Sequence, residues 1–201
     1  MAIPVVPATA KKDAATIASK FKVTAQTEFR GELSLTVSRE QFKEIATYCK
    51  NELGYTYLID ISSVDYFGNE PRFEMVYELQ NFERCDHLRL KYPVSEDDCS
   101  VPSVVDLWAT ADWHEREVYD MMGIQFKGHP DLKEVGHLRR ILMWDGYPFY
   151  PLRKDFPLAG RPSDMPDVAF SGVAPLAGGP FVTSPTTATS QDREPRSREM
   201  E

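Results

Sequence analysis

The sequence has few of the residue patterns that accompany a cofactor or a catalytic centre. Only three of its 201 residues are cysteines. Cys49, Cys85 and Cys99 are widely spaced and form no CxxC pair, so they indicate neither a disulfide framework nor an iron–sulfur or zinc site. Such cysteines are typical of ordinary thiols in a reducing cytoplasm. The sequence also lacks a Gly-rich phosphate loop and a GxSxG elbow, which argues against a stand-alone nucleotide or acyl-transfer enzyme.

Charge and hydrophobicity argue against two further classes of protein. The formal net charge is -8 and no basic cluster is longer than a pair, so nucleic acid is not an expected partner. No window approaches eighteen apolar residues, so membrane association is expected only through partner proteins. The opening MAIPVVPATAKKDA has no basic residue before its short apolar run, and it predicts neither a signal nor a transit peptide.

What is present divides the chain into four predicted parts. Residues 1–21 form an N-terminal segment with a short helix over Lys12 to Phe21, and residues 22–126 form an α+β core domain. Residues 127–158 contain several X-Pro steps and are predicted to be an extended, partner-binding arm. Residues 159–201 hold too few large apolar side chains to order themselves and are predicted to be a flexible tail.

The core shows alternating apolar residues that predict strands. The expected strands are Lys22 to Phe29, Glu32 to Val37, Thr56 to Ser62, Arg72 to Leu79 and Asp86 to Val94. Their alternation predicts a sheet with one apolar face. Between the second and third strands, Ser38 to Gln41 is read as a capping box that opens a helix, and Gly54 closes it.

The stretch from Val104 to Pro157 holds most of the unusual residue combinations, and two interpretations fit its helical part. In the first, one long helix places Glu115 in the middle of an apolar stripe, where a buried carboxylate needs an Arg or a cluster of donors. In the second, the helix restarts at Asp112 and Glu115 folds back onto the Asp112 backbone N–H as a capping box. Both interpretations end the helix near Gly123.

The other side of this helix is expected to face solvent or a partner. Asp112, Arg116 and Asp120 follow i, i+4 spacing and predict a surface ion-pair ladder. Trp113 points outward, which hints at a partner surface. The extended segment that follows carries many large apolar side chains, and a second protein is the expected place to bury them: Leu138, Ile141, Leu142, Met143, Trp144, Phe149, Tyr150 and Leu152.

A set of short motifs carries a family resemblance. Glu115-Arg116-Glu117 is followed by Val118 to Ile124, then by Gly128-His129-Pro130-Asp131, Arg139-Arg140-Ile141-Leu142 and Pro151-Leu152-Arg153-Lys154-Asp155. With Tyr57 to Asp60, Val64-Asp65-Tyr66 and Arg72 to Tyr77 upstream, this set resembles the C subunit, or 30 kDa subunit, of bacterial NADH:quinone oxidoreductase, also called respiratory complex I. The similarity covers about residues 30 to 158, and Lys133 to Leu138 is an insertion relative to the family pattern.

The resemblance implies a two-layer α+β domain, with a mixed sheet covered by helices on one side and a C-terminal arm that wraps a neighbouring subunit. It implies a non-catalytic subunit that binds no cofactor itself, because FMN and iron–sulfur clusters lie in other subunits of the complex. The implied partners are the quinone-site D subunit and the cluster-bearing B subunit. The implied location is the cytoplasmic side of the inner membrane, in the hydrophilic arm of a proton-pumping enzyme that passes electrons from NADH to quinone.

The motifs supply the residues that we expect at the partner interface. They are Trp113, Glu115, Arg116, Glu117, Asp120, His129, Pro130, Arg139, Arg140, Pro151, Leu152, Arg153, Lys154 and Asp155. For the last three of these, a solvated charged patch is the alternative to an interface. The stiff frame of flanking prolines favours the interface, because it suits planar hydrogen bonding by arginine.

Two other functions are compatible with parts of the sequence. An equivalent subunit of a membrane-bound hydrogenase, or of a ferredoxin-dependent quinone reductase, carries similar motifs. A metal hydrolase built from His114, Glu115, Asp120, His129 and His137 is the more distant alternative. Adjacent residues such as His114 and Glu115 point in different directions on a helix, and the histidines are expected to hydrogen-bond locally instead.

Overall fold

A mixed five-stranded sheet is the centre of the computed structural model, which describes residues 5–132, 138–144 and 146–157. The strands are β1 (Val23–Phe29), β2 (Glu32–Val37), β3 (Tyr57–Asp65), β4 (Phe73–Asn81) and β5 (Asp86–Val94). Their order in the sheet is β1-β2-β5-β4-β3, with β2 and β5 parallel and the other neighbours antiparallel. All five predicted strands are therefore confirmed, with boundaries that differ by at most three residues.

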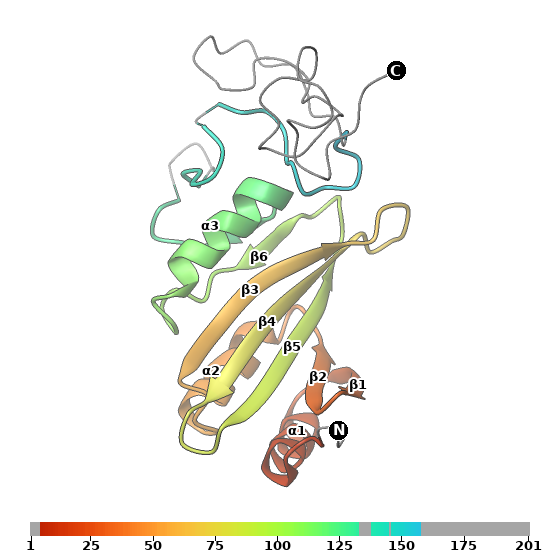
Figure 1. The fold of residues 1–201 in the computed structure, drawn as a ribbon, viewed down its shortest axis with the longest axis vertical. Coiled ribbons are helices and arrows are strands. Elements are labelled where there is room, and N and C mark those ends of the chain that lie inside the picture. Colours follow the sequence, from red (N-terminus) through yellow and green to blue (C-terminus); the bar gives the residue numbers. More distant parts are fainter. Residues whose placement is uncertain (1–4, 133–137, 145, 158–201) are drawn as a thin grey trace, which may run out of the picture. The chain divides into compact units, whose positions relative to one another are not determined.

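Within the described residues, three helices accompany the sheet. They are α1 (Ala8–Lys20), α2 (Phe42–Asn51) and α3 (Ala111–Met122). Helix α2 lies behind the sheet in Figure 1, α1 contacts β2 and β5, and α3 contacts β3. This arrangement confirms the predicted α+β class, with a mixed sheet and helices packed against it.

The alternation of β4 and β5 creates the buried face of the sheet. Every second residue of each strand is buried: Phe73, Met75, Tyr77, Leu79, Leu88, Leu90, Tyr92 and Val94. The ring of Phe42 from α2 packs on them, with its centroid 4.4 Å from the Tyr77 ring and 4.5 Å from the Tyr92 ring. The hydroxyls of this tyrosine pair lie 3.0 Å apart and satisfy each other inside the core.

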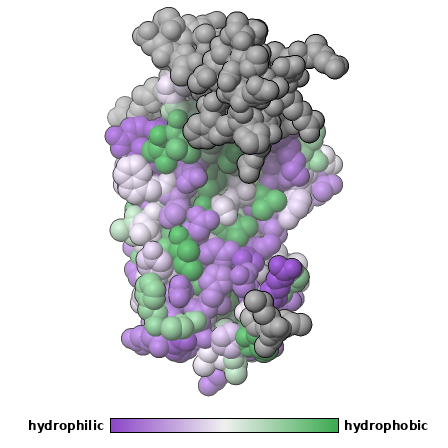
Figure 2. Space-filling view, viewed as in Figure 1, coloured by the Kyte–Doolittle hydropathy of each residue, from purple (hydrophilic) through white to green (hydrophobic). Residues whose placement is uncertain are grey.

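The opposite face of the sheet carries charged residues that pair across strands. Arg89 of β5 binds both Glu78 of β4 and Glu32 of β2, the latter at 2.8 Å, and Lys91 lies 3.1 Å from Glu74. In the view of Figure 2, hydrophilic surface surrounds smaller hydrophobic patches. One face packs against helices and the other is polar, as expected for such a sheet.

The sequence patterns did not reveal a second, smaller sheet. Strands β6 (Ser100–Pro102) and β7 (Gln125–Lys127) pair in parallel, with α3 between them in the chain. Three residues are too few for alternation to be recognised. Their pairing brings the residues before α3 next to the residues after it.

Two details of the helices differ from expectation. Helix α1 begins at Ala8 rather than Lys12, because Ala10 and Ala14 also pack into the core. Helix α2 forms as predicted, but the capping box was wrong: its N-cap is Gln41 without a side-chain cap bond, and the Ser38 hydroxyl binds the Glu40 carboxylate instead. Gly54 follows α2 with a φ of 74°, the left-handed conformation that glycine adopts most easily.

The chain divides into two compact units at Lys154. The first holds all of the helices and strands named above. The second begins at Asp155, and of it the structure describes residues 155–157. The predictions for the 159–201 tail, for His137 and for the first four residues lie outside the described residues.

Candidate interaction site around helix α3

Helix α3 begins at Ala111 and its last residue is Met122, and each interpretation of the sequence proves partly right. The break before the helix matches the second interpretation, and Gly123 ends it with a φ of 76°. The side chain of Glu115 matches the first, because it is completely buried and caps nothing. Its partner is the backbone N–H of Val104, which donates to Oε1 at 2.7 Å, rather than an arginine.

The predicted surface ladder on the other side of α3 is wrong. Arg116 and Asp120 are both buried, and each pairs with a residue beyond the helix rather than along it. The Nε of Arg116 donates to the Arg139 carbonyl at 3.1 Å, and its guanidinium lies 4.8 Å from the centroid of the Trp113 ring. Trp113 itself is 62% exposed, which confirms that it points outward.

Asp120 fastens the segment that follows β7 to the helix. Its Oδ2 accepts three consecutive backbone N–H groups, from Ile141 at 2.9 Å, Leu142 at 2.6 Å and Met143 at 2.9 Å. Its Oδ1 accepts a bond from Arg140 at 2.6 Å. Successive N–H groups that converge on one anion form a nest. Burial raises the pKa of this carboxyl, but the nest and Arg140 outweigh it and hold the pKa below its usual value.

His129 contributes a second link between α3 and the residues after it. Its Nδ1 accepts the backbone N–H of Asp131 at 3.0 Å, so the proton is assigned to Nε2. That nitrogen lies 3.2 Å from the carbonyl oxygen of Asp112 and donates to it. His129 therefore hydrogen-bonds locally, as predicted.

A third set of contacts attaches Leu152 and Arg153 to the end of α3. The Nε of Arg153 donates to the Met122 carbonyl at 2.6 Å, and the backbone N–H of Leu152 donates to the Met121 carbonyl at 3.2 Å. These two carbonyls belong to the last turn of α3, whose oxygens have no partner within the helix. The Arg153 guanidinium also lies 4.6 Å from the Tyr150 ring centroid. Arg153 thus caps a helix of its own chain.

Asp65 joins this segment to the sheet. Its carboxylate accepts two bonds from Arg72, both of 2.9 Å, and one from the backbone N–H of Lys154 at 2.8 Å. Arg72 also binds Glu96 at 2.6 Å. The bonds from Arg72, reinforced by the Lys154 N–H, hold the pKa of Asp65 below its usual value. Sequence reasoning missed this role, because Asp65 and Lys154 are far apart in the chain and no local pattern links them.

The chain itself buries part of the apolar surface that was expected to need a second protein. Leu138 is 3% exposed within the core, and Met143 is half-buried against it. That part of the prediction is therefore corrected. Other side chains of the segment remain open, since Leu142 is 56% exposed and Leu152 is 58% exposed.

The predicted interface residues fall into two groups in the structure. Glu115, Arg116, Asp120 and His129 are buried within the chain, and Arg140, Pro151 and Arg153 are partly buried. The others lie on the surface: Trp113, Glu117, Pro130, Arg139, Leu152, Lys154 and Asp155. The first group positions the helix and the following segment, and the second can touch a partner.

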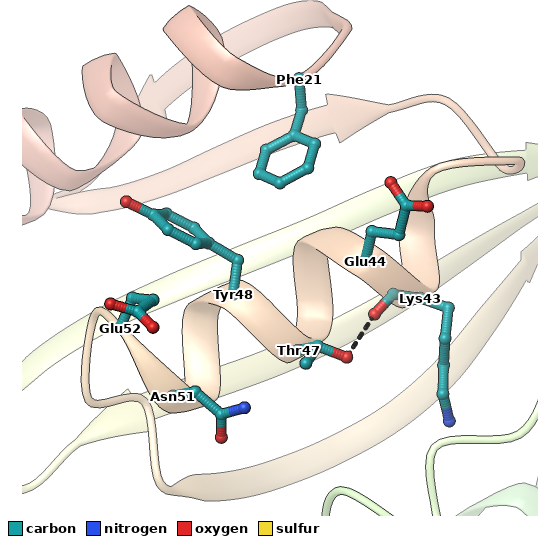
Figure 3. Close-up of a pocket in the computed structure, with 7 residues that line it drawn as sticks. All are labelled: Phe21, Lys43, Glu44, Thr47, Tyr48, Asn51 and Glu52. Carbon is teal, nitrogen blue, oxygen red and sulfur yellow. Dashed lines mark hydrogen bonds between the residues drawn. The ribbon is translucent and has the colours of Figure 1, made fainter.

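A separate pocket lies between the end of α1 and the helix α2. Phe21 and Tyr48 line it with ring centroids 5.7 Å apart, together with Lys43, Glu44, Thr47, Asn51 and Glu52. Figure 3 shows the lysine and the two glutamates spread around the pocket rather than directed at one point. It therefore offers no convergent polar groups of the kind that fix a ligand.

Two features of the described residues concern metal binding and membrane insertion. They form no group of three or more His, Cys, Asp or Glu side chains that could hold a metal ion. The set proposed for a metal hydrolase is dispersed, since His114 binds Asp60, Asp120 binds Arg140 and Glu115 lies in the core. In the same part of the chain, every helix is too short or too polar to span a membrane.

The fold and the site together define a class of protein: an α+β domain that uses its buried charges to hold an extended segment and an exposed tryptophan in fixed positions. The family model described as "Respiratory-chain NADH dehydrogenase, 30 Kd subunit" matches residues 35–162. The chain belongs to this family.

Named relatives agree with the family. The chain is 47% identical over 134 residues to the NADH-quinone oxidoreductase C subunit of Citrifermentans bemidjiense, covering 67% of this chain and 80% of the relative. It is 49% identical to the protein of the same name from Geobacter sulfurreducens, with 66% and 79% covered.

Solved structures show the same fold. A trypsin-resistant fragment of Nqo5 is 33% identical with a TM-score of 0.55, covering 62% of this chain and 99% of the fragment. A chain of the membrane-bound sulfane sulfur reductase, an archaeal respiratory membrane complex, is 26% identical with a TM-score of 0.59. That match covers 74% of this chain and 85% of the other.

Proposed function

We propose that this protein is the C subunit of an NADH–quinone oxidoreductase and serves its complex as a non-catalytic structural component. The family match over residues 35–162 carries this proposal. The enzyme as a whole transfers electrons from NADH to quinone, and this chain supplies a surface on which other subunits assemble. FMN and the iron–sulfur clusters belong to those other subunits, and this chain reaches the membrane through them, on its cytoplasmic side.

The partners in this proposal are the quinone-site D subunit and the cluster-bearing B subunit. The contact surface consists of exposed side chains on and after α3: Trp113, Glu117, Arg139, Leu142 and Leu152. Trp is enriched among the residues that dominate binding energy at interfaces. Trp113 suits this role because the buried Arg116 stacks on its ring and limits its motion, which lowers the entropy lost on binding.

The neighbour from the sulfane sulfur reductase supports a second candidate, an equivalent subunit in a complex with another electron donor. That neighbour is 26% identical, whereas the NADH-quinone oxidoreductase relatives are 47% and 49% identical. The NADH-linked complex is therefore the favoured one.

Copurification from native membranes tests both candidates. A tagged chain should capture a complex that includes the flavin-bearing subunit and the B and D subunits, identified by mass, and that oxidises NADH with quinone. Capture of a nickel-bearing hydrogenase subunit, or of a complex without NADH activity, would favour the second candidate. Capture of no other respiratory subunit would contradict both.

The contact surface is tested separately with Trp113→Ala. Truncating a tryptophan that anchors an interface costs roughly 2 kcal/mol or more, so less assembled complex is expected in membranes. Phe29→Ala is a matched control, because Phe29 is also an exposed aromatic side chain, 64% exposed, but lies on β1. Equal losses from the two variants would contradict the proposed surface.

A further inference from the structure

Among the buried acids that the structure describes, Glu115 is fully buried and yet has one carboxylate oxygen without a hydrogen-bond partner. The side chain is 0% exposed. Its Oε1 accepts the Val104 N–H, but its Oε2 has no hydrogen-bond partner among the described residues. By contrast Asp120, which is equally buried, has four donors. A buried carboxylate with one oxygen left without a donor is costly, and adding a proton removes most of that cost.

The groups that face Glu115 come from every element packed around it. Helix α2 contributes Lys43, which is bound to Asp106 and to the Ser103 carbonyl. The loop before α3 contributes Asp106, whose negative charge helps to raise the pKa of Glu115. Strands β4 and β5 contribute Tyr77 and Tyr92, whose pKa values are raised first by burial and further by Glu115. Lys43 is thus already committed to other oxygens, and the tyrosine hydroxyls bond to each other.

The position of Glu115 couples its charge to the site described above. Through the Val104 N–H it joins α3 to the loop before the helix, and it lies beneath the sheet close to Tyr77 and Tyr92. Five residues along the same helix, Asp120 holds the 140–143 turn. We propose that Glu115 is a proton-dependent latch: when it is protonated, α3 is held firmly on the sheet, and when it is ionised, α3 and the 140–143 turn open more often.

The direction and range of the effect follow from the environment of the acid. Burial raises the pKa of Glu115 to about 7, against the opposing effects of the Val104 N–H, the nearby Ser103 hydroxyl and Lys43. Where α3 is detached, the group returns to an ordinary value near 4.5. The closed state therefore binds the proton more tightly, so its stability is fully present below pH 4.5 and is lost as pH rises through about 7. The opening equilibrium should increase on the order of a hundredfold across this range.

Hydrogen exchange of the whole chain at a series of pH values, corrected for intrinsic rates, tests the latch. In the unaltered protein, the opening constants of the α3 amides and of the Ile141, Leu142 and Met143 amides should rise between pH 5 and 8. Amides of β4 and β5 should change much less. In Glu115→Gln, which has no charge to lose, the rise should disappear. Glu117→Gln is the matched control, because it removes an exposed carboxylate from the same helix, and it should keep the rise.

Three results would overturn the latch. One is a Glu115→Gln protein with the same pH dependence as the unaltered protein. Another is an equal rise in the amides of β4 and β5, which would mean global rather than local opening. If the Gln variant does not fold, the Glu115 carboxyl can be titrated directly by carbon-13 NMR in the unaltered protein. A midpoint near 7 supports the latch, and a midpoint below 5 rules it out.

Discussion

The sheet core and the junction between α3 and the residues after it are both well packed, but different interactions hold them. In the core, side chains such as Phe42, Tyr77 and Leu90 bury apolar surface in many small contacts. In the junction, a few carboxylates accept backbone N–H groups: Asp120 holds the 140–143 turn, and Asp65 holds Lys154.

The contrast shows how an extended, proline-containing segment is fixed to a domain. It makes no continuous ladder of backbone bonds, so its N–H groups need acceptors from elsewhere. Aspartates on a strand and a helix supply these acceptors, and arginines pair with the same aspartates and neutralise their charge. Hydrophobic stabilisation is spread over many residues, whereas this attachment depends on a few atoms. The two regions should therefore respond differently to substitution and to pH.

The largest effect is expected in the core. Phe42→Ala removes a fully buried ring that packs against both Tyr77 and Tyr92, at a cost of about 3–5 kcal/mol in the free energy of unfolding. Urea unfolding followed by circular dichroism measures it, with Phe29→Ala as the exposed control. A loss below about 1 kcal/mol would mean that the core is less tightly packed than the structure indicates.

A smaller and local effect is expected from Asp120→Ala. The substitution leaves three N–H groups without their acceptor, and Arg140 keeps only the backbone carbonyl of residue 120. Each buried group without a partner costs roughly 1–3 kcal/mol, which the segment avoids by detaching into water. Limited proteolysis should then cut within residues 138–154 at least tenfold faster, while the circular dichroism of the sheet is retained. Asp131→Ala is the control, since that carboxylate is partly exposed and its ion pairs are long. If proteolysis is unchanged in Asp120→Ala, the nest is not what holds the segment.

Lowering the pH should destabilise the junction before the core, without any substitution. The folded protein holds the pKa of Asp65 and of Asp120 below their usual values. Their contribution is therefore present above the unfolded pKa of about 4 and is lost as pH falls through the lower folded values. Hydrogen exchange between pH 5 and 2.5 should show the Ile141 to Met143 amides losing protection before those of β4. If the junction and the core lost protection at the same pH, the proposed difference between them would be contradicted.

The sequence allowed the core to be predicted but not the junction, for a physical reason. Alternation in β4 and β5 is a local property, so strands such as Asp86–Val94 could be placed to the residue. The groups after β7 that Asp120 and Asp65 hold lie 20 or more residues away in the chain, and nothing in the residues between specifies the pairing. Spacing alone suggested that Arg116 and Asp120 form a surface ladder, because i, i+4 spacing cannot distinguish an exposed helix face from a covered one.

Family motifs supplied part of what periodicity could not. The Arg139-Arg140-Ile141-Leu142 and Pro151 to Asp155 motifs were expected at a partner interface, which remains a proposal. The structure adds that Arg140 and Arg153 bind helix α3 of their own chain. A motif marks residues that matter, but it does not say whether their partner lies in the same chain.

The smallest effect on the isolated chain is expected from Leu142→Ser. This variant tests whether the side chain binds a partner while leaving the segment attached to α3. The side chain of Leu142 is 56% exposed, while its backbone N–H binds Asp120 and is retained in the variant. The free energy of unfolding should therefore change by less than about 0.5 kcal/mol, as is usual for a surface substitution. If the exposed side chains after α3 contact another subunit, the same variant should lower the amount of assembled complex in membranes, because apolar contact area is lost. Asp120→Ala lowers assembly by a different route, since it frees the whole segment. Normal assembly with Leu142→Ser, alongside impaired assembly with Asp120→Ala, would mean that partners recognise the position of the segment but not this side chain.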